Sequence, residues 1–194
     1  ESRMENGRRI TDREMLEVVT MVYGGLVNKN VVAGLQGLGI GALGMTGADL
    51  DIIRSVKRPV AEVDYGFVGD VQQVCGKTLA GMIEQNIVPV IAPLTHDGQG
   101  SLLNTNADTI AGETAKALVP YFDVTLIFCF EKKGVLRNEL DEESVIPEMN
   151  EALFDRFRKD GTVGGGMIPK LENALEAIRR GVKEVIITNA QAIG

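Results

Sequence analysis

Compact apolar runs alternate along this chain with segments whose apolar residues recur at helical spacing. The runs predict buried strands at 41–45, 88–92, 123–130 and 184–188, and β-branched residues broken by turn formers predict hairpins over 52–74. Helical spacing predicts helices at 12–22, 26–38, 75–86, 106–118, about 153–157 and about 171–178. An interruption is expected at Gly24-Gly25. Strands that alternate with helices in this way predict an α/β domain on a mainly parallel sheet.

Composition changes this picture only a little. The 194 residues fit a single domain spanning 1–194, and 23 glycines indicate many tight turns or close approaches of backbone to a ligand. The net charge of −7 argues against a nucleic-acid partner, whereas a nucleotide pocket needs only local positive charge. Cys75 and Cys129 fit neither a disulfide framework nor a zinc motif. No unbroken apolar run reaches the ~18 residues of a membrane span, so a cytoplasmic location without a membrane partner is expected.

The first group of candidate residues lies at 102–108, with the sequence LLNTNAD. A helix is predicted to begin there, and helix N-termini attract carboxylates and phosphates because their N–H groups are unpaired. Asn104 and Asn106 could donate to a carboxylate and accept from an amide, which suits an N-acyl amino acid. Taken alone, capping of the helix by Asn106 and Asp108 explains the segment at least as well.

A second group lies at 164–170, where three glycines lead into a helix with Pro169 in its first turn. Lys170 opposes the helix dipole, and a bound anion would explain its position. Glycines let a phosphate reach the backbone, and a lysine supplies charge for a transferred phosphoryl group. The spacing is not that of a P-loop, and a surface lysine beside a flexible loop is an equally good explanation of these residues alone.

Two further features are less informative by themselves. Arg8 and Arg9 stand just before a helix, where a guanidinium could grip a carboxylate or could simply be solvated. His96 lies in a loop rich in turn formers, and without a second histidine it is expected to pack in that loop rather than to act in a catalytic triad or metal site. The polar run 1–9 leads into a helix without an opening strand, as in a truncated chain.

The order and spacing of several short motifs are more specific than any one of them. They are NGRRIT (6–11), GLVNK (25–29), GFVGDV (66–71), VPVIAP (88–93), LLNTNADTIAG (102–112), KKGVL (132–136), GGGMIPKLENALEAI (164–178) and GVKEVIIT (181–188). The series resembles the acetylglutamate kinase branch of the amino-acid kinase family over nearly the whole chain. NTNAD together with GGMIPK is characteristic of that branch.

The resemblance implies a three-layer αβα sandwich on a mainly parallel sheet. It also implies transfer of the ATP γ-phosphate to the γ-carboxylate of N-acetyl-L-glutamate, a step of arginine biosynthesis. By position in the motifs, Arg9 would hold a carboxylate of the substrate, while Asn104 and Asn106 would bind its amide and α-carboxylate. Asp108 would orient the catalytic lysines rather than act as a base. Lys170 would stabilise charge on the transferred group.

The resemblance also implies a place for the nucleotide and for other parts. Glu131 and Gly134 in the stretch 130–134, and Gly165, Gly166 and Met167 in the turn 164–167, would lie near ATP. The nucleotide would bring Mg²⁺ with it, so no metal site on the protein is implied. The hairpins around 66–71 would cover the substrate. A homodimer or a larger homo-oligomer is expected.

The chain departs from the family pattern in two ways. The usual opening strand with a lysine and glycines, and the HGGG-like loop after it, are absent, so the first βαβ portion and a second catalytic lysine are expected to be missing. The C-terminus also looks clipped. Around Glu131 the sequence FEKK (130–133) replaces the T-D-V-P-like stretch common in the family, which makes the adenine contacts less certain.

Several alternatives therefore remain open at the level of sequence. The chain could be a related amino-acid kinase with another acceptor, such as an aminoadipate kinase or a nucleoside monophosphate kinase. It could also be a non-catalytic fragment that folds without doing chemistry. Neither the acyl group of the substrate, acetyl, succinyl or other, nor inhibition by arginine can be read from the residues.

Overall fold

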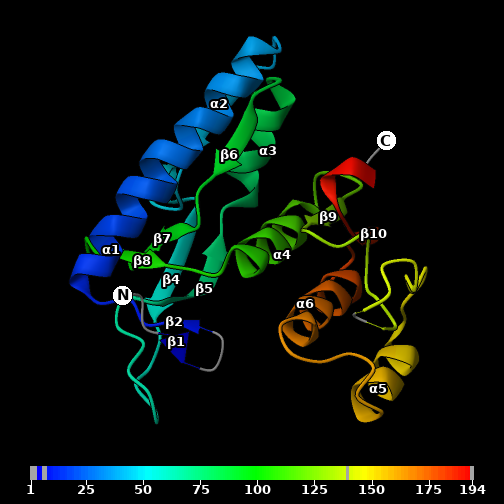
Figure 1. The fold of residues 1–194 in the computed structure, drawn as a ribbon. Coiled ribbons are helices and arrows are strands. Elements are labelled where there is room, and N and C mark those ends of the chain that lie inside the picture. The colour runs from blue at the N-terminus through cyan, green and yellow to red at the C-terminus, as the bar shows by residue number, and fades with distance from the viewer. Residues whose placement is uncertain (1–3, 6–7, 139, 193–194) are drawn as a thin grey trace. The chain divides into compact units, whose positions relative to one another are not determined.

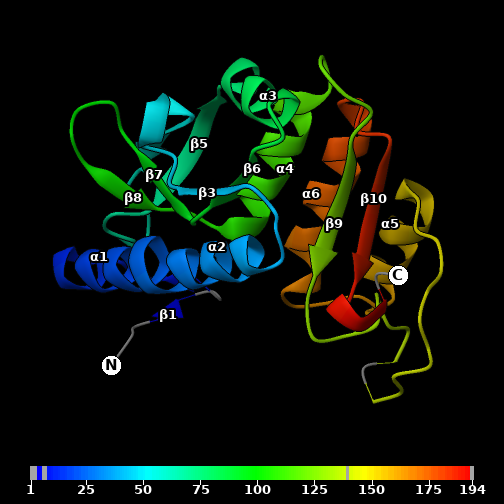
Figure 2. The same cartoon turned by 90° about the horizontal axis from the view of Figure 1, so that it is seen from above.

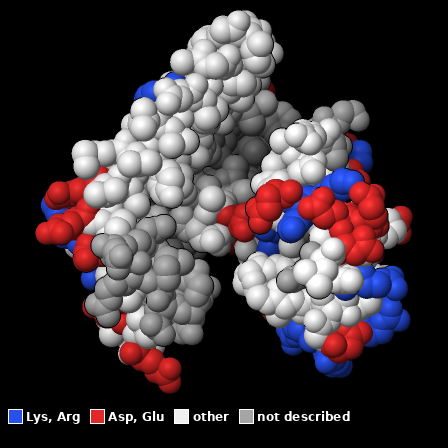
Figure 3. All heavy atoms as spheres, in the orientation of Figure 1, with Lys and Arg blue, Asp and Glu red and all other residues white. Residues whose placement is uncertain are grey.

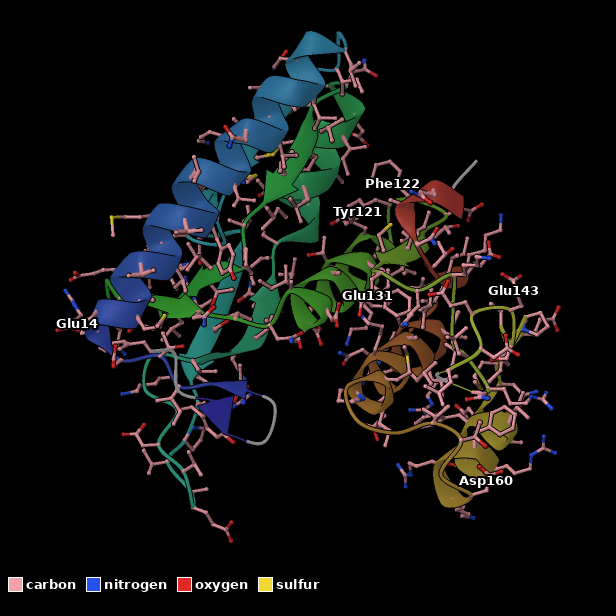
Figure 4. The ribbon with its side chains drawn as sticks, in the orientation of Figure 1. Glu14, Tyr121, Phe122, Glu131, Glu143 and Asp160 are labelled. Atoms are coloured by element: carbon pink, nitrogen blue, oxygen red, sulfur yellow. The ribbon has the colours of Figure 1, made fainter. Side chains whose placement is uncertain are left out.

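The structure, a computed structural model, describes residues 4–5, 8–138 and 140–192. The chain falls into two compact units, Glu1–Tyr121 and Phe122–Gly194, here called the N-terminal and C-terminal units, and Figure 4 labels the two residues at their boundary. Each unit has its own sheets, helices and core and is described by itself. The expectation of a single domain over 1–194 stays a prediction.

The N-terminal unit alternates helices with short strands (Figure 1). Its helices are α1 (Arg13–Val19), the π-helical segment η1 (Thr20–Val27), α2 (Asn28–Gly37), the 3-10 helix η2 (Asp49–Asp51), α3 (Gly76–Glu84) and α4 (Ala107–Leu118). Its strands are β1 (Met4–Glu5), β2 (Arg8–Arg9), β3 (Ala42–Met45), β4 (Ile53–Lys57), β5 (Gly69–Val74), β6 (Val88–Ile91), β7 (Leu94–His96) and β8 (Leu102–Asn104).

The sheets of this unit combine parallel and antiparallel pairs. Strands β3 and β6 are parallel, and a four-stranded sheet has the order β5-β4-β7-β8. In that sheet β4 is antiparallel to β5, which confirms the hairpin predicted over 52–74. Strands β7 and β8 form a second antiparallel pair. They lie inside and just after the loop that was predicted around His96. Each has only three residues, too few to produce a recognisable alternation in the sequence.

The core of the N-terminal unit lies between α3, α4 and the strands. Ile52, Ile53 and Leu79 are completely buried in one cluster that also contains Met82 and Ile110. Leu79 and Met82 belong to α3 and Ile110 to α4, the helices predicted at 75–86 and 106–118. Full burial of such side chains contributes about 1.5–3 kcal/mol each. This cluster therefore fixes the start of α4, where the candidate asparagines lie.

The C-terminal unit is smaller. It contains the strands β9 (Thr125–Cys129) and β10 (Glu184–Thr188), the helices α5 (Glu151–Lys159) and α6 (Met167–Arg179), and the short 3-10 helix η3 (Ala190–Ala192). Strands β9 and β10 are parallel and lie side by side in Figure 2. Phe154 and Phe157 of α5 and Leu171 of α6 are buried in one cluster, which confirms the apolar residues predicted to mark these helices.

The first helix is longer than expected because the two helices predicted at 12–22 and 26–38 are continuous. Segments α1, η1 and α2 follow one another without a break, and the junction residues Thr20 and Asn28 keep right-handed helical dihedral angles. Gly24-Gly25 lies inside the π-helical segment, so the predicted interruption is wrong. A helix can absorb glycines by widening one or two turns when neighbouring residues hold its ends.

The same helix bears on the expectation that no segment could span a membrane. Residues 13–37 form one helix of 25 residues that is long and apolar enough, by length and composition alone, to cross a bilayer. This helix was missed when only unbroken apolar runs were considered, because a few polar residues lie between its apolar ones. Many helices of globular proteins pass the same test, so this feature is weak evidence for a membrane.

Asn28 and Lys29, from the motif GLVNK, fasten this helix to the parallel pair β3–β6. The side-chain amide of Asn28, which is only 3% exposed, donates to the carbonyl of Val90 at 2.8 Å. The amine of the exposed Lys29 donates to the carbonyl of Gly44 at 2.9 Å. A Cβ at Gly44 would lie 2.0 Å from the Asn28 side-chain oxygen, so a glycine is required where helix and strand meet.

Replacing Asn28 by alanine should destabilise the protein by about 1–3 kcal/mol, because it removes a buried donor and leaves polar backbone unpaired. Lys29→Ala is the matched control: it also removes a donor to a backbone carbonyl, but at an exposed position, and should change stability by less than about 1 kcal/mol. Urea denaturation of both variants measures the difference. Equal effects of the two substitutions would contradict the buried-anchor interpretation.

Candidate functional site

Hydrogen bonds from Asn104 and Thr105 hold the first candidate segment, 102–108, in place. The backbone N–H of Asn104 donates to the carbonyl of Phe67 at 2.8 Å. The next residue, Thr105, donates its backbone N–H to the carbonyl of Pro93 at 3.1 Å. The Thr105 hydroxyl also lies 2.8 Å from the hydroxyl of Thr95, and both side chains are buried. Buried, satisfied hydrogen bonds of this kind rigidify a segment.

Asn106 is the N-cap of α4. Its side-chain oxygen accepts from the backbone N–H of Thr109 at 2.9 Å and lies 3.3 Å from the Thr109 hydroxyl. The capping interpretation is therefore confirmed. Because the oxygen is engaged, the group that this exposed side chain can offer to a ligand is its NH₂. Asp108, half-buried in the first turn, complements the helix dipole by about 0.3–1 kcal/mol.

Thr11 joins the start of α1 to the segment beyond β4 and to Asn104. Its backbone N–H donates to Tyr65 at 2.9 Å, and its carbonyl accepts from the N–H of Phe67 at 2.7 Å. Its hydroxyl, completely buried, accepts from the side-chain amide of Asn104 at 3.0 Å. Gly66 lies between the two bonded residues with φ of +71°, and a Cβ there would be 2.2 Å from the Thr11 carbonyl oxygen. This position of the hairpin therefore requires glycine.

Arg9 belongs to β2, two residues before Thr11. Its backbone pairs with Met4 across the antiparallel β1–β2 ribbon. Its side chain lies outside the described part of the structure, so the carboxylate-holding role expected of Arg9 stays a prediction.

In the C-terminal unit, Lys170 lies in the first turn of α6. Its ammonium group is 4.7 Å from the ring centroid of Phe128 and 5.9 Å from that of Phe130. Phe128 is buried near the carboxyl end of β9, and Phe130 follows that strand. Cation–π contacts of this type help to hold an ammonium group in position. The carboxyl end of a parallel strand is where ligands of α/β proteins gather.

The three glycines before α6 form an open turn. Gly164, Gly165 and Gly166 are exposed, and a Cβ added to any of them would meet nothing within 4 Å. Gly165 has φ of +52°, a conformation that side chains disfavour. The N-cap Gly166 provides no side-chain hydrogen bond, and Met167 is the first helical residue. The backbone N–H groups of Met167 and Ile168 donate to the carbonyls of Gly164 and Gly165 at 3.2 and 3.4 Å. The part of this helix start that is accessible to an anion is therefore the backbone of the glycine turn itself.

Close packing explains why residue 134, in the stretch 130–134, is a glycine. Gly134 is buried, and a Cβ there would lie 2.9 Å from Val145 and 3.4 Å from the carbonyl oxygen of Ile187. Close packing against β10 accounts for this residue without a nucleotide. Glu131 is exposed in the loop after β9 and is labelled in Figure 4. Contacts of either residue with ATP stay predictions.

Sequence reasoning missed the importance of Thr11 and Gly66. The N-cap of α1 is Asp12, whose side chain accepts from the N–H of Met15 at 2.8 Å. The start predicted for this helix at residue 12 is therefore confirmed. Nothing in the local sequence shows that Thr11 meets a residue 93 positions further along the chain.

The loop expected around His96 is in part strand: His96 ends β7, and its side chain, 16% exposed, packs against its neighbours. Its Nε2 lies 2.7 Å from a carboxylate oxygen of Asp51, and its Nδ1 accepts from the N–H of Gly98 at 3.2 Å. Hydrogen bonds from Arg54, and secondarily from His96, hold the pKa of Asp51 below its usual value. Within the described residues, no three histidine, cysteine or acidic side chains gather as metal ligands would.

The described elements place the chain in the α/β class, with parallel strand pairs in both units and the candidate residues at helix N-termini and strand ends. The chain belongs to the amino acid kinase family, whose family model matches residues 1–189. Both the predicted fold class and the family resemblance are confirmed.

Named relatives narrow the similarity within this family. Acetylglutamate kinase of Bacteroides thetaiotaomicron is 69% identical over 193 residues, a match that covers 100% of this chain and 75% of the relative. Acetylglutamate kinase of Methanopyrus kandleri is 40% identical over 197 residues, covering 100% of this chain and 79% of the relative.

Solved structures agree about the fold. A crystal structure of a Streptococcus mutans protein superposes with a TM-score of 0.83 at 27% identity, covering 97% of this chain and 74% of that one. N-acetylglutamate synthase from Neisseria gonorrhoeae, complexed with coenzyme A and N-acetyl-glutamate, superposes with a TM-score of 0.82 over 100% of this chain and 43% of that one. At 19% identity the second likeness concerns the fold alone.

Proposed function

We propose that the chain acts as an N-acetyl-L-glutamate kinase of arginine biosynthesis, which transfers the γ-phosphate of ATP to the γ-carboxylate of an N-acyl-L-glutamate. Its 69% identity to the acetylglutamate kinase of B. thetaiotaomicron over the whole chain supports this proposal. The structural observation that carries it is Lys170, whose ammonium stacks on Phe128 beside a glycine-rich helix start without a side-chain cap. A cation beside an exposed glycine turn suits a phosphate.

The proposed mechanism relies on position and charge. A carboxylate is already ionised at neutral pH and needs no general base, so the difficulty of the reaction is to bring two anions together. In this scheme Lys170 neutralises charge on the transferred phosphoryl group. The exposed backbone of the turn 164–166 borders the nucleotide phosphates, with Met167 at the first helical position. Mg²⁺ arrives with the ATP, and Glu131 and Gly134 border the nucleotide.

The acceptor is assigned to the N-terminal unit. Asn104 and Asn106 contact the acylated amino group and the α-carboxylate, and Arg9 pairs with a carboxylate of the substrate. Asp108 orients cationic groups rather than removing a proton. The acyl group is taken as acetyl, after the name of the relatives, and the assay below includes a larger one. The enzyme is proposed to work in the cytoplasm, where ATP is abundant.

The decisive test is an ADP-release assay on the protein in its complete natural length, with N-acetyl-, N-succinyl- and free L-glutamate as acceptors. Activity is expected with an acylated glutamate, and activity with free glutamate alone would refute the acyl-binding site. Lys170→Met should lower kcat by about 100- to 1,000-fold, because one preorganised charge is lost from the transition state. Lys183→Met, which removes an exposed lysine paired with Asp123 at 3.8 Å, is the matched control and should retain activity.

The helix start at Gly166 gives a second test, because its surroundings leave room for a side chain. Gly166→Asp and Gly166→Asn are nearly isosteric and should each change stability by less than about 1 kcal/mol. Only the aspartate places a negative charge where the nucleotide phosphates are proposed to bind, so it should raise the KM for ATP about tenfold more than asparagine does. Similar KM values for ATP in both variants would contradict phosphate binding at this helix start.

We also propose that the chain forms a homodimer through its first long helix. Exposed apolar side chains follow this helix, namely Val18, Met21, Val22, Leu26, Val27, Val31 and Leu38. Its surface in Figure 3 is mostly white apart from charged side chains at its α1 end and one small blue area further along, which means that charged side chains are scarce there. Exposed apolar patches of this kind mark interaction sites, and a second copy is the simplest partner for one.

Sedimentation velocity should show a dimer that dissociates in Met21→Glu and Leu26→Glu variants, because each buries an unpaired charge in the interface. Leu140→Glu is the control: Leu140 is 96% exposed in the C-terminal unit, and its substitution should leave the dimer intact. A monomeric wild-type protein, or one that pellets with lipid vesicles through this helix, would overturn the proposal.

A further inference from the structure

The two candidate asparagines have opposite ends of their carboxamides engaged within the protein. Asn104 uses its NH₂ group, which donates to the Thr11 hydroxyl at 3.0 Å. Asn106 uses its oxygen, which accepts from the N–H of Thr109 at 2.9 Å. What remains for a ligand is therefore the acceptor oxygen of Asn104, with the second N–H of its NH₂ group, and the NH₂ donors of Asn106. The two side chains are two residues apart on a segment whose backbone is fixed by Phe67 and Pro93.

Thr11 is held firmly enough to orient Asn104. Its N–H and carbonyl are both bonded to the hairpin segment, at Tyr65 and Phe67, and its side chain is completely buried. A β-branched side chain has few rotamers, so a fixed backbone also fixes the hydroxyl oxygen. The carbonyl of Thr11 comes so close to Gly66 that this glycine has no room for a Cβ.

We propose that Thr11 is a positioning residue that determines the specificity of the site for N-acylated amino acids. By binding the NH₂ end of Asn104, it leaves the carbonyl oxygen of Asn104 to accept from the amide N–H of the ligand. The NH₂ of Asn106 then donates to the neighbouring α-carboxylate. The class of ligand is an α-carboxylate with a secondary amide on the same carbon. This inference rests on the proposed function, since it assigns the acyl-glutamate to these asparagines.

The chemistry predicts discrimination between an amide and an ester of the same shape. In 2-acetoxyglutarate an ester oxygen replaces the N–H of N-acetyl-L-glutamate, and an oxygen of Asn104 facing it would be repelled and unpaired. A site built around a hydrogen bond rejects the analogue that lacks the donor. If Thr11 did not hold Asn104, the carboxamide could turn and present its NH₂ to the ester.

The experiment measures KM for N-acetyl-L-glutamate and for 2-acetoxyglutarate, at saturating ATP, in the complete protein and in Thr11→Val, Thr11→Ser and Asn104→Ala variants. Valine keeps the shape of Thr11 and its backbone bonds but removes the hydroxyl, whereas serine keeps the hydroxyl. The wild type and Thr11→Ser should prefer the amide about tenfold or more. In Thr11→Val this preference should fall severalfold, with the KM for ATP unchanged. A Thr11→Val/Asn104→Ala double variant should show no further loss beyond Asn104→Ala.

The outcomes distinguish failure of the proposed function from failure of the role proposed for Thr11. A wild type that phosphorylates no N-acyl-glutamate would refute the proposed function itself. A wild type that does so, but whose amide preference is the same in Thr11→Val, would refute the role of Thr11 alone. A general loss of kcat in Thr11→Val with an intact preference, not rescued by serine, would show that Thr11 is merely structural. Circular dichroism melting curves identify a variant that fails to fold. Should Thr11→Val not fold, an amide preference that survives unchanged in Asn104→Ala would still overturn the proposal.

Discussion

The buried hydrogen bonds around Thr11 are the constraint on which the proposed acceptor site of the N-terminal unit depends. They join three parts that are distant in sequence: the start of α1, the hairpin segment at Tyr65 and Phe67, and Asn104 before α4. Such bonds are worth little individually, but a buried donor or acceptor left unpaired costs about 1–3 kcal/mol, so the three parts have few alternative arrangements. The side chains that would meet a ligand are thereby fixed before it arrives, which is the condition for positioning two reactants.

The C-terminal unit is proposed to bind the nucleotide by means other than buried hydrogen bonds. A nucleotide needs accessible backbone and positive charge, and this unit supplies exposed glycines at the start of α6 and Lys170 stacked on Phe128. In the proposed reaction both substrates are anions, so charge rather than acid–base chemistry limits the rate. In the proposed scheme the division of tasks follows from this: hydrogen-bonding amides recognise the acceptor, and a cation at a helix start receives the phosphates.

Much of the fold could be predicted from the sequence because it depends on local patterns. The helix capped by Asn106, the hairpin at 52–74 and the parallel strands β9 and β10 all follow from periodicity and turn residues. Gly24-Gly25 was misjudged because neighbours along the helix override local propensity. The contact between Thr11 and Asn104 spans 93 residues and leaves no local signal, so the candidate asparagines could be named while the residue that orients one of them could not.

The most direct test of this account is an NMR titration of the ¹⁵N-labelled complete protein with each substrate separately. The account predicts that N-acetyl-L-glutamate perturbs the backbone amides of Thr11, Phe67 and Asn104, and that ATP with Mg²⁺ perturbs those of Gly165, Gly166 and Met167. Perturbations by N-acetyl-L-glutamate that spare the segment around Asn104, or by ATP that spare the start of α6, would contradict the assignment of the two substrates to these two places.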